Sequence, residues 1–133
     1  MKKIILFTFL ISIIMFTSCE KSDGLWDDCI KLSAKSVDFN ANGGDFTVTS
    51  KGTFWLLGTS KPYQAAPLFD VPVENRTTTP YQITGEWYTI NRPQEKILTI
   101  HIDPNTTGKK RIIYVNLEMG DYFDNITVNQ AEK

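Results

Sequence analysis

Few residues in this 133-residue chain have the types and spacing that catalysis requires. A nucleophilic enzyme needs a base beside its nucleophile, and the only histidine is His101. His101 alternates with the apolar residues of a predicted strand, so we expect it to be inert on the outer face of a sheet. Paired carboxylates for glycoside hydrolysis must converge in a cleft, but the acidic residues here fall in a tether, turns and strand ends, so we predict no enzymatic activity. They are Asp27, Asp28, Glu86, Glu95, Glu118 and Asp121.

Metal and cofactor chemistry has equally little support. Residues 121–125, with the sequence DYFDN, could hold calcium, but a polar hairpin turn explains the same pattern. No glycine-rich phosphate loop follows a predicted strand. We predict neither a metal site nor a cofactor.

The first of the two cysteines has a context that does suggest chemistry. Two lysines precede an apolar run over residues 4–16, which suits a secretory signal and is shorter than the roughly 20 residues of a membrane span. Residues 16–19, FTSC, resemble the bacterial lipobox, with Phe16 in place of its usual leucine. The resemblance implies that residues 1–18 are a lipoprotein signal peptide and that Cys19 is lipidated. A plain secreted protein with an incidental cysteine is the alternative.

The residues after Cys19 bear on location. Residues 20–23, EKSD, resemble the short acidic signals that send lipoproteins of the Bacteroidetes group to the outside of the outer membrane, although Lys21 interrupts them. We expect a lipidated flexible tether over residues 19–29 and a lipid anchor in the outer membrane, facing the cell surface or, alternatively, the periplasm. Several acyl chains together hold a protein firmly in a bilayer. A polar tether without targeting meaning has the same composition.

Charge and cysteine content exclude nucleic-acid binding and a disulfide bond. The formal net charge is −1, and a mildly acidic chain without a basic stripe has no electrostatic footprint for nucleic acid. With Cys19 lipidated, Cys29 is alone, so we predict no disulfide bond. We expect Cys29 to be a small, half-buried hydrophobe near the first strand.

From residue 30 onward the apolar residues alternate with polar ones, and no helical period is sustained. This alternation is clearest over residues 45–50, 96–103, 111–117 and 125–130, with turn residues between the runs. We therefore predict one all-β domain over residues 30–133, an immunoglobulin-like antiparallel β-sandwich of about seven strands. The expected core contains Phe39, Phe46, Val48, Trp55, Trp87, Leu98, Ile100, Ile113, Val115, Ile126 and Val128.

One stretch, residues 59–85, departs from this rhythm. Its four prolines, Pro62, Pro67, Pro72 and Pro80, exclude a long central strand. We expect an elaborated connection with short edge strands around residues 68–73. Long structured loops in compact domains are often functional.

Several of these residues together resemble the BACON domain, a β-sandwich module of Bacteroidetes proteins, over roughly residues 31–131. The matching residues are Leu32-Ser33, Phe39, Gly43-Gly44, Phe46, Val48, Trp55, Trp87, residues 105–107, Arg111, Ile126, Val128 and Gln130. Residues 59–85 are longer than the family's usual connection. The resemblance implies association with carbohydrate, a proposal made for the family from the domains that accompany it.

Most of these matching residues have an expected structural role. Gly43 and Gly44 suit a hairpin turn with positive φ, and two tryptophans can fill a sandwich core. Arg111 and Gln130 share the parity of core residues, so we expect them at strand ends, bonded to loop carbonyls.

Two functions remain for a non-catalytic lipoprotein of this kind. One is a surface module that binds a glycan or glycoprotein through exposed aromatic rings in loops. The candidate rings are Tyr63, Tyr81, Tyr122 and Phe123. The alternative is a structural spacer or protein–protein interaction subunit of an outer-membrane assembly. Because Lys133 closely follows the last predicted strand, we expect binding or assembly with a separate partner rather than spacing of an attached enzyme.

Overall fold

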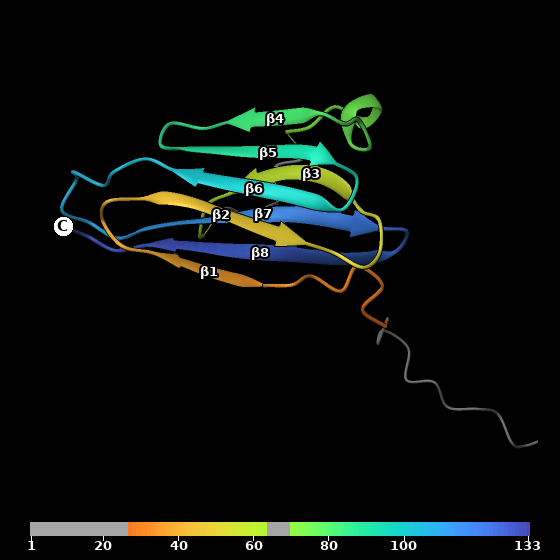
Figure 1. The fold of residues 1–133 in the computed structure, drawn as a ribbon, viewed down its shortest axis with the longest axis horizontal. Helices are drawn as coiled ribbons and strands as arrows, with labels where there is room; N and C mark the ends of the chain where they lie inside the picture. Colours follow the sequence, from red (N-terminus) through yellow and green to blue (C-terminus); the bar gives the residue numbers. More distant parts are fainter. Residues whose placement is uncertain (1–26, 64–69) are drawn as a thin grey trace, which may run out of the picture.

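A computed structural model describes residues 27–63 and 70–133, which form two four-stranded β-sheets packed face to face (Figure 1). The strands are β1 (Ser36–Phe39), β2 (Gly44–Thr49), β3 (Trp55–Ser60), β4 (Tyr81–Thr84), β5 (Tyr88–Gln94), β6 (Ile97–Ile102), β7 (Arg111–Met119) and β8 (Tyr122–Gln130). A 3₁₀ turn, η2 (Val73–Asn75), precedes β4. The predicted all-β sandwich is confirmed, with eight strands instead of about seven. The signal peptide, Cys19 and the first part of the tether lie outside the described residues.

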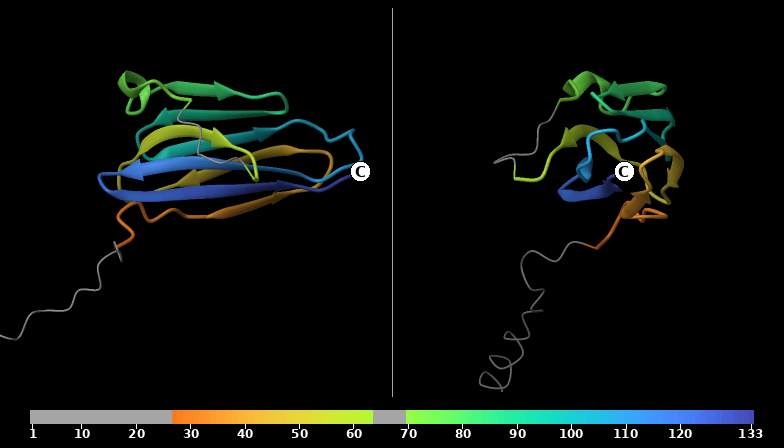
Figure 2. Two further views of the ribbon diagram at one scale, coloured as in Figure 1. Left: turned by 180° about the vertical axis from the view of Figure 1, so that it is seen from behind. Right: turned by 90° about the vertical axis from the view of Figure 1, so that its left-hand side faces the viewer.

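The strand order is that of an immunoglobulin-like sandwich with two changes. One sheet has the order β1-β8-β7-β3 and the other β2-β6-β5-β4. In the second sheet, β2, β6 and β5 correspond to the immunoglobulin strands B, E and D. In the first sheet, β3, β7 and β8 correspond to strands C, F and G. The first strand, β1, pairs in parallel with β8. The additional strand is β4, at the edge beside β5. Figure 2 shows the two layers from behind and from one end.

The core lies between the sheets and follows the predicted alternation along most strands. Seven expected members are buried: Val48, Leu98, Ile100, Ile113, Val115, Ile126 and Val128. Phe39 and Trp87 are half-buried and pack against this cluster. Strand alternation therefore identified the core-facing side of β6, β7 and β8 correctly.

Two expected core residues are instead exposed, for different reasons. Phe46 lies opposite buried Ile100 and so faces the other sheet, but it is 41% exposed because β2 is an edge strand. Trp55 is 43% exposed because its neighbours Phe54 and Leu56 take the buried positions. The register of β3 also shifts between Leu56 and Gly58, at a bulge.

Residues 59–85 form a connection, as expected, although their ends belong to strands. Residues 68 and 69 lie outside the described part, and residues 70–73 form no strand; the edge strand of this segment is β4. Val71 is buried, and its N–H donates to the carbonyl of Leu57 (3.1 Å). The N–H of Leu56 donates to the carbonyl of Arg76 (2.9 Å). The returning chain thus covers the free edge of β3.

A buried arginine joins this connection to the core. Arg92 is 2% exposed, and its guanidinium donates to the carbonyls of Arg76 (2.6 Å), Phe54 (2.7 Å) and Glu95 (3.0 Å). It also lies over the Phe54 ring, 4.6 Å from the ring centroid. Burial lowers the pKa of the Arg92 guanidinium. Its inward position was not predicted from the sequence.

The turn after β1 has the predicted glycine geometry but is not a hairpin, since β1 and β2 belong to different sheets. Gly43 and Gly44 have φ of 72° and 138°. A Cβ on Gly43 would collide with the backbone carbonyl oxygen of Ile102. Gln130 supports this end as predicted, since its amide donates to the carbonyl of Asp103 (2.8 Å). Arg111 is the first residue of β7, so its predicted place at a strand end is confirmed. Its predicted bonds to loop carbonyls are wrong: its guanidinium lies over the Trp87 ring, 5.2 Å from the centroid, and no loop carbonyl of the described residues accepts a hydrogen bond from it.

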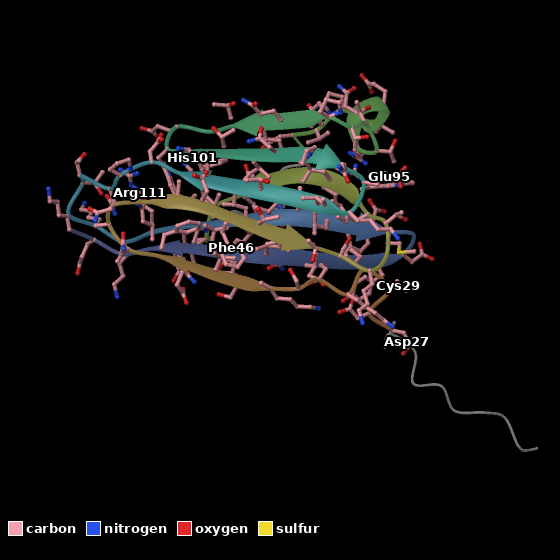
Figure 3. All side chains as sticks on the ribbon, viewed as in Figure 1. Asp27, Cys29, Phe46, Glu95, His101 and Arg111 are labelled. Atoms are coloured by element: carbon pink, nitrogen blue, oxygen red, sulfur yellow. The ribbon has the colours of Figure 1, made fainter. Side chains whose placement is uncertain are left out.

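The chain enters the sandwich at Asp27, at what we call the proximal end; the opposite end, which includes Arg111, is the distal end (Figure 3). Lys35 links two segments at the proximal end, because its ammonium forms salt bridges with Asp28 (3.0 Å) and Asp124 (2.8 Å). The hydrogen bond with Asp124, and then that with Asp28, raises the pKa of Lys35. Cys29 is exposed rather than half-buried, and its thiol donates to the carbonyl of Asp27 (3.0 Å).

Over residues 27–63 and 70–133, no helix is long and apolar enough to cross a membrane.

Candidate ligand-binding surface

The residues considered for catalysis are exposed or half-buried, and none of them is buried within the described part of the chain. His101 lies on the outer face of the β2-β6-β5-β4 sheet, as predicted, where its Nδ1 meets the carboxylate of Asp45 at 2.7 Å and its Nε2 that of Asp103 at 3.4 Å. The hydrogen bond with Asp45 is the main cause that raises the pKa of His101. No group of three or more His, Cys, Asp or Glu side chains within the described part of the chain is arranged to hold a metal ion. In the DYFDN segment, Asp124 binds Lys35.

The four aromatic residues predicted to line loops are in different places. Tyr63 is in a turn after β3 and is fully exposed, with φ of 66°. Tyr81 is in β4 and Tyr122 in β8, and both pack against the core. The Tyr122 hydroxyl also lies 3.2 Å from Asp124. Phe123 is in β8 and is 59% exposed.

Phe123 belongs to a row of three side chains on the outer face of the β1-β8-β7-β3 sheet. The register pairs Phe123 with Glu118 and Glu118 with Trp55. Because directly paired residues lie on the same face of a sheet, these side chains form one line across β8, β7 and β3. The two aromatic residues are separated by two inter-strand spacings, about 10 Å. We call these three residues the aromatic row. The left panel of Figure 2 views the sandwich from the side of this sheet.

The face beside the aromatic row is polar. In the adjacent row, Asn116 is paired with Asn125, and its amide donates to the hydroxyl of Ser60 (3.1 Å). The next row contains Tyr114 and Thr127. Amide and hydroxyl groups of this kind can both donate and accept hydrogen bonds. The outer face therefore has two solvent-exposed aromatic rings next to several neutral side chains that can form hydrogen bonds.

The carboxylate between the two rings is available to a ligand. Glu118 is half-buried, and its carboxylate forms neither a hydrogen bond nor an ion pair with any side chain among residues 27–63 and 70–133. An acceptor flanked by two aromatic rings suits a ligand that combines apolar faces with hydroxyl donors. Sequence reasoning found Phe123 but missed Trp55 and Glu118, because their grouping depends on the register of β3 against β7.

Comparison with protein-family models gives no match, and comparison with curated proteins gives none. Among solved structures, the NMR structure of a protein from Bacteroides thetaiotaomicron is similar, with a TM-score of 0.60, 21% identity and coverage of 84% of this chain and 93% of that chain. A Bacteroides ovatus GH5 xyloglucanase in complex with a XXXG heptasaccharide gives a TM-score of 0.49 and 18% identity, over 77% of this chain and 19% of the xyloglucanase. The first likeness agrees with the β-sandwich fold and indicates nothing about activity.

Proposed function

We propose that this protein is a non-catalytic, lipid-anchored lipoprotein of the outer membrane that binds a glycan or glycoprotein at the cell surface. The observation that carries the proposal is the aromatic row, in which Trp55 and Phe123 are both exposed on either side of Glu118, whose carboxylate pairs with no side chain of the described residues. The resemblance of the sequence to the BACON domain supports the same ligand class, and the lipobox-like FTSC segment supports the anchor.

Sugar chemistry fits the arrangement of this face. A pyranose ring has an apolar C–H face that stacks on an aromatic ring, and a rim of hydroxyls that needs hydrogen-bond partners. Trp55 and Phe123 supply two stacking positions about 10 Å apart. Glu118, Asn116 and Asn125 supply the polar groups beside them. A saccharide of at least two units lying across β3, β7 and β8 would use all of these contacts.

A spacer or interaction subunit that docks on another outer-membrane protein is the alternative. Tryptophan is also enriched at the energetic centres of protein interfaces. The centre of a protein interface is depleted of charged residues, however, whereas this row has a carboxylate at its middle. The polar surroundings favour the sugar.

The test is a glycan array with the mature protein and its Trp55→Ala and Phe123→Ala variants. We expect binding to a saccharide that each substitution weakens at least tenfold, with melting temperatures within a few degrees of the parent, because exposed side chains contribute little to stability. Tyr63→Ala is the matched control: it removes an exposed ring outside the row. Loss of binding in Tyr63→Ala alone would move the site to the turn after β3. A parent protein that binds no glycan and co-purifies with one stoichiometric membrane partner would favour the alternative.

The anchor is tested separately. Mass spectrometry of the N-terminus of the native protein should show an acylated Cys19, because acylation of the new N-terminus follows from the lipobox-like segment. Cys19→Ser should leave the protein unprocessed or release it from the membrane fraction. An unmodified mature chain that begins at another residue would contradict the assignment.

A further inference from the structure

The distal end contains a second surface that the aromatic row does not use. Three adjoining hollows, of about 390, 390 and 330 Å³, share the side chains of Lys110 and Arg111. Each has the size of a small ligand site. Together they form what we call the distal cleft. Arg111 and Glu118 are seven residues apart on β7, so the cleft lies about 23 Å along the strand from the aromatic row.

The distal cleft is cationic, although the chain as a whole is slightly acidic. Its positively charged lining residues are Lys61, Lys109, Lys110 and Arg111, and its negatively charged lining residues are Asp38 and Glu86. The ammonium groups of Lys109 and Lys110 pair with no carboxylate of the described residues. The side chain of Asp38 already accepts a hydrogen bond from Asn129 (2.9 Å). An anion in the cleft would therefore meet unneutralised positive charge.

Two further carboxylates close to the cleft, those of Asp103 and Asp45, do not cancel this charge, because they face His101. The backbone N–H of Asp103 donates to the carbonyl of Trp87 (3.0 Å), which brings this acidic residue close to the cleft. Its carboxylate, however, faces the Nε2 of His101. Asp45 binds the other ring nitrogen of the same histidine. Both acidic groups thus form a separate cluster around His101.

The guanidinium of Arg111 has unused hydrogen-bonding capacity. It makes no hydrogen bond with the residues that the structure describes, and its Nη1 is buried without a partner. The directly paired residue, Gln130, is 1% exposed and has a buried Oε1 that also lacks a partner within the described part of the chain. Both side chains line the same hollow. A guanidinium presents its donors as a fork that fits a carboxylate or sulfate, so Arg111 is suited to a ligand that brings oxygen acceptors. The Oε1 of Gln130 is itself an acceptor and would need a donor, such as a sugar hydroxyl.

An aromatic ring stands beside this fork in a fixed position. Trp87 lines two of the three hollows. Arg111 lies over its ring, and Tyr88 meets it edge-on with ring centroids 5.4 Å apart. A ring held by its neighbours before binding loses little entropy when a ligand packs against it.

We propose that the distal cleft is a second binding site, which takes acidic saccharides by holding a carboxylate or sulfate group at Arg111 and Lys110 with the sugar ring against Trp87. This site goes beyond the aromatic row and does not depend on it. Uronic acids and sulfated sugars share the required chemistry, which is an anionic group on a pyranose.

Titration calorimetry and ¹H–¹⁵N NMR of the mature protein test the proposal with four probes. These are an oligogalacturonate, a sulfated oligosaccharide, a neutral oligosaccharide of equal length, and polyphosphate. We expect at least one acidic sugar to bind and to shift the Trp87 indole resonance, with an affinity that falls as salt is added. The sugar that binds identifies the anionic group. Equal binding of the neutral oligosaccharide, or binding of polyphosphate as tight as that of either sugar, would overturn the proposal.

Charge-matched variants locate the site. The double substitution Lys109→Gln/Lys110→Gln should weaken the acidic sugar about tenfold or more, since charge-assisted contacts are lost. Lys31→Gln/Lys51→Gln removes the same charge at exposed proximal positions and should change affinity less than twofold. Trp55→Ala should leave this binding unchanged even if it abolishes binding at the aromatic row. Equal losses in both double variants would show a general charge effect and no site.

Discussion

Replacing Arg92 with methionine tests whether this buried side chain stabilises the fold. Methionine keeps most of the volume and removes the charge and all donors. Of the three carbonyls that Arg92 contacts, that of Arg76 keeps a bond from the N–H of Leu56, and that of Glu95 belongs to an exposed turn residue that water can reach. The carbonyl of Phe54 is buried and would lose the guanidinium donor.

The expected cost follows from these contacts. A buried carbonyl without a donor costs about 1–3 kcal/mol, and a hydrogen bond to a charged group contributes about 1.5–3 kcal/mol. The methionine recovers part of this through apolar burial, since a buried guanidinium is itself costly to desolvate. We therefore expect Arg92→Met to lose about 3 kcal/mol of unfolding free energy. For a domain of this size that lowers the melting temperature by roughly 12–24 °C.

Urea denaturation followed by tryptophan fluorescence measures the loss, with the slope of the transition as a check on two-state unfolding. Arg111→Met is the matched control. Arg111 is partly exposed and forms no hydrogen bond with the described residues, so its replacement should cost less than about 1 kcal/mol. An Arg92→Met protein that unfolds within 1 kcal/mol of the parent would show that the buried guanidinium contributes no net stability.

Three further measurements check the fold and its charges. Gly43→Ala should destabilise the domain more than Gly108→Ala, because both glycines have positive φ but only a Cβ at Gly43 would collide with backbone; equal melting temperatures would contradict the geometry of that turn. Asp45→Asn should lower the pKa of His101 in an NMR titration; since this pKa is raised on folding, the stabilisation from the pair is complete at acidic pH and is lost as pH rises through the folded pKa. Val115→Asp should unfold the domain, since it places an unpaired charge in a fully buried position; a parent-like melting curve would show that the strand phase is wrong.

Alternation of apolar residues predicted most of the sandwich because each strand has one buried face. It identified the inward side of β6, β7 and β8 without any information about pairing. It failed where burial depends on the neighbours: Phe46 faces the other sheet from an edge strand, and Trp55 precedes a bulge. Such edges and register shifts are properties of the assembled sheets and leave little trace in one strand.

The candidate sites depended even more on pairing. Phe123 was recognisable as an aromatic residue near a turn, but its relation to Trp55 and Glu118 exists only in the register of three strands. Arg92 shares the parity of buried Ile90, so alternation could have placed it inward. A charged residue at an inward position normally indicates a strand end, and two of the three carbonyls that bind Arg92, those of Phe54 and Arg76, come from distant segments.

The point of entry of the chain gives the two proposed sites different surroundings. Residues 19–26 span at most roughly 27 Å when extended, at about 3.4 Å per residue. If Cys19 is the anchor, the aromatic row stays in the half of the domain near the membrane, whereas the distal cleft faces outward with Arg111 (Figure 3). A flexible insertion after Ser22 should therefore increase binding of large saccharides to the row on intact cells, because it relieves steric hindrance by the membrane. Binding of acidic sugars to the distal cleft should not change. An equal increase at both sites would show that the domain does not stand on the membrane by its proximal end.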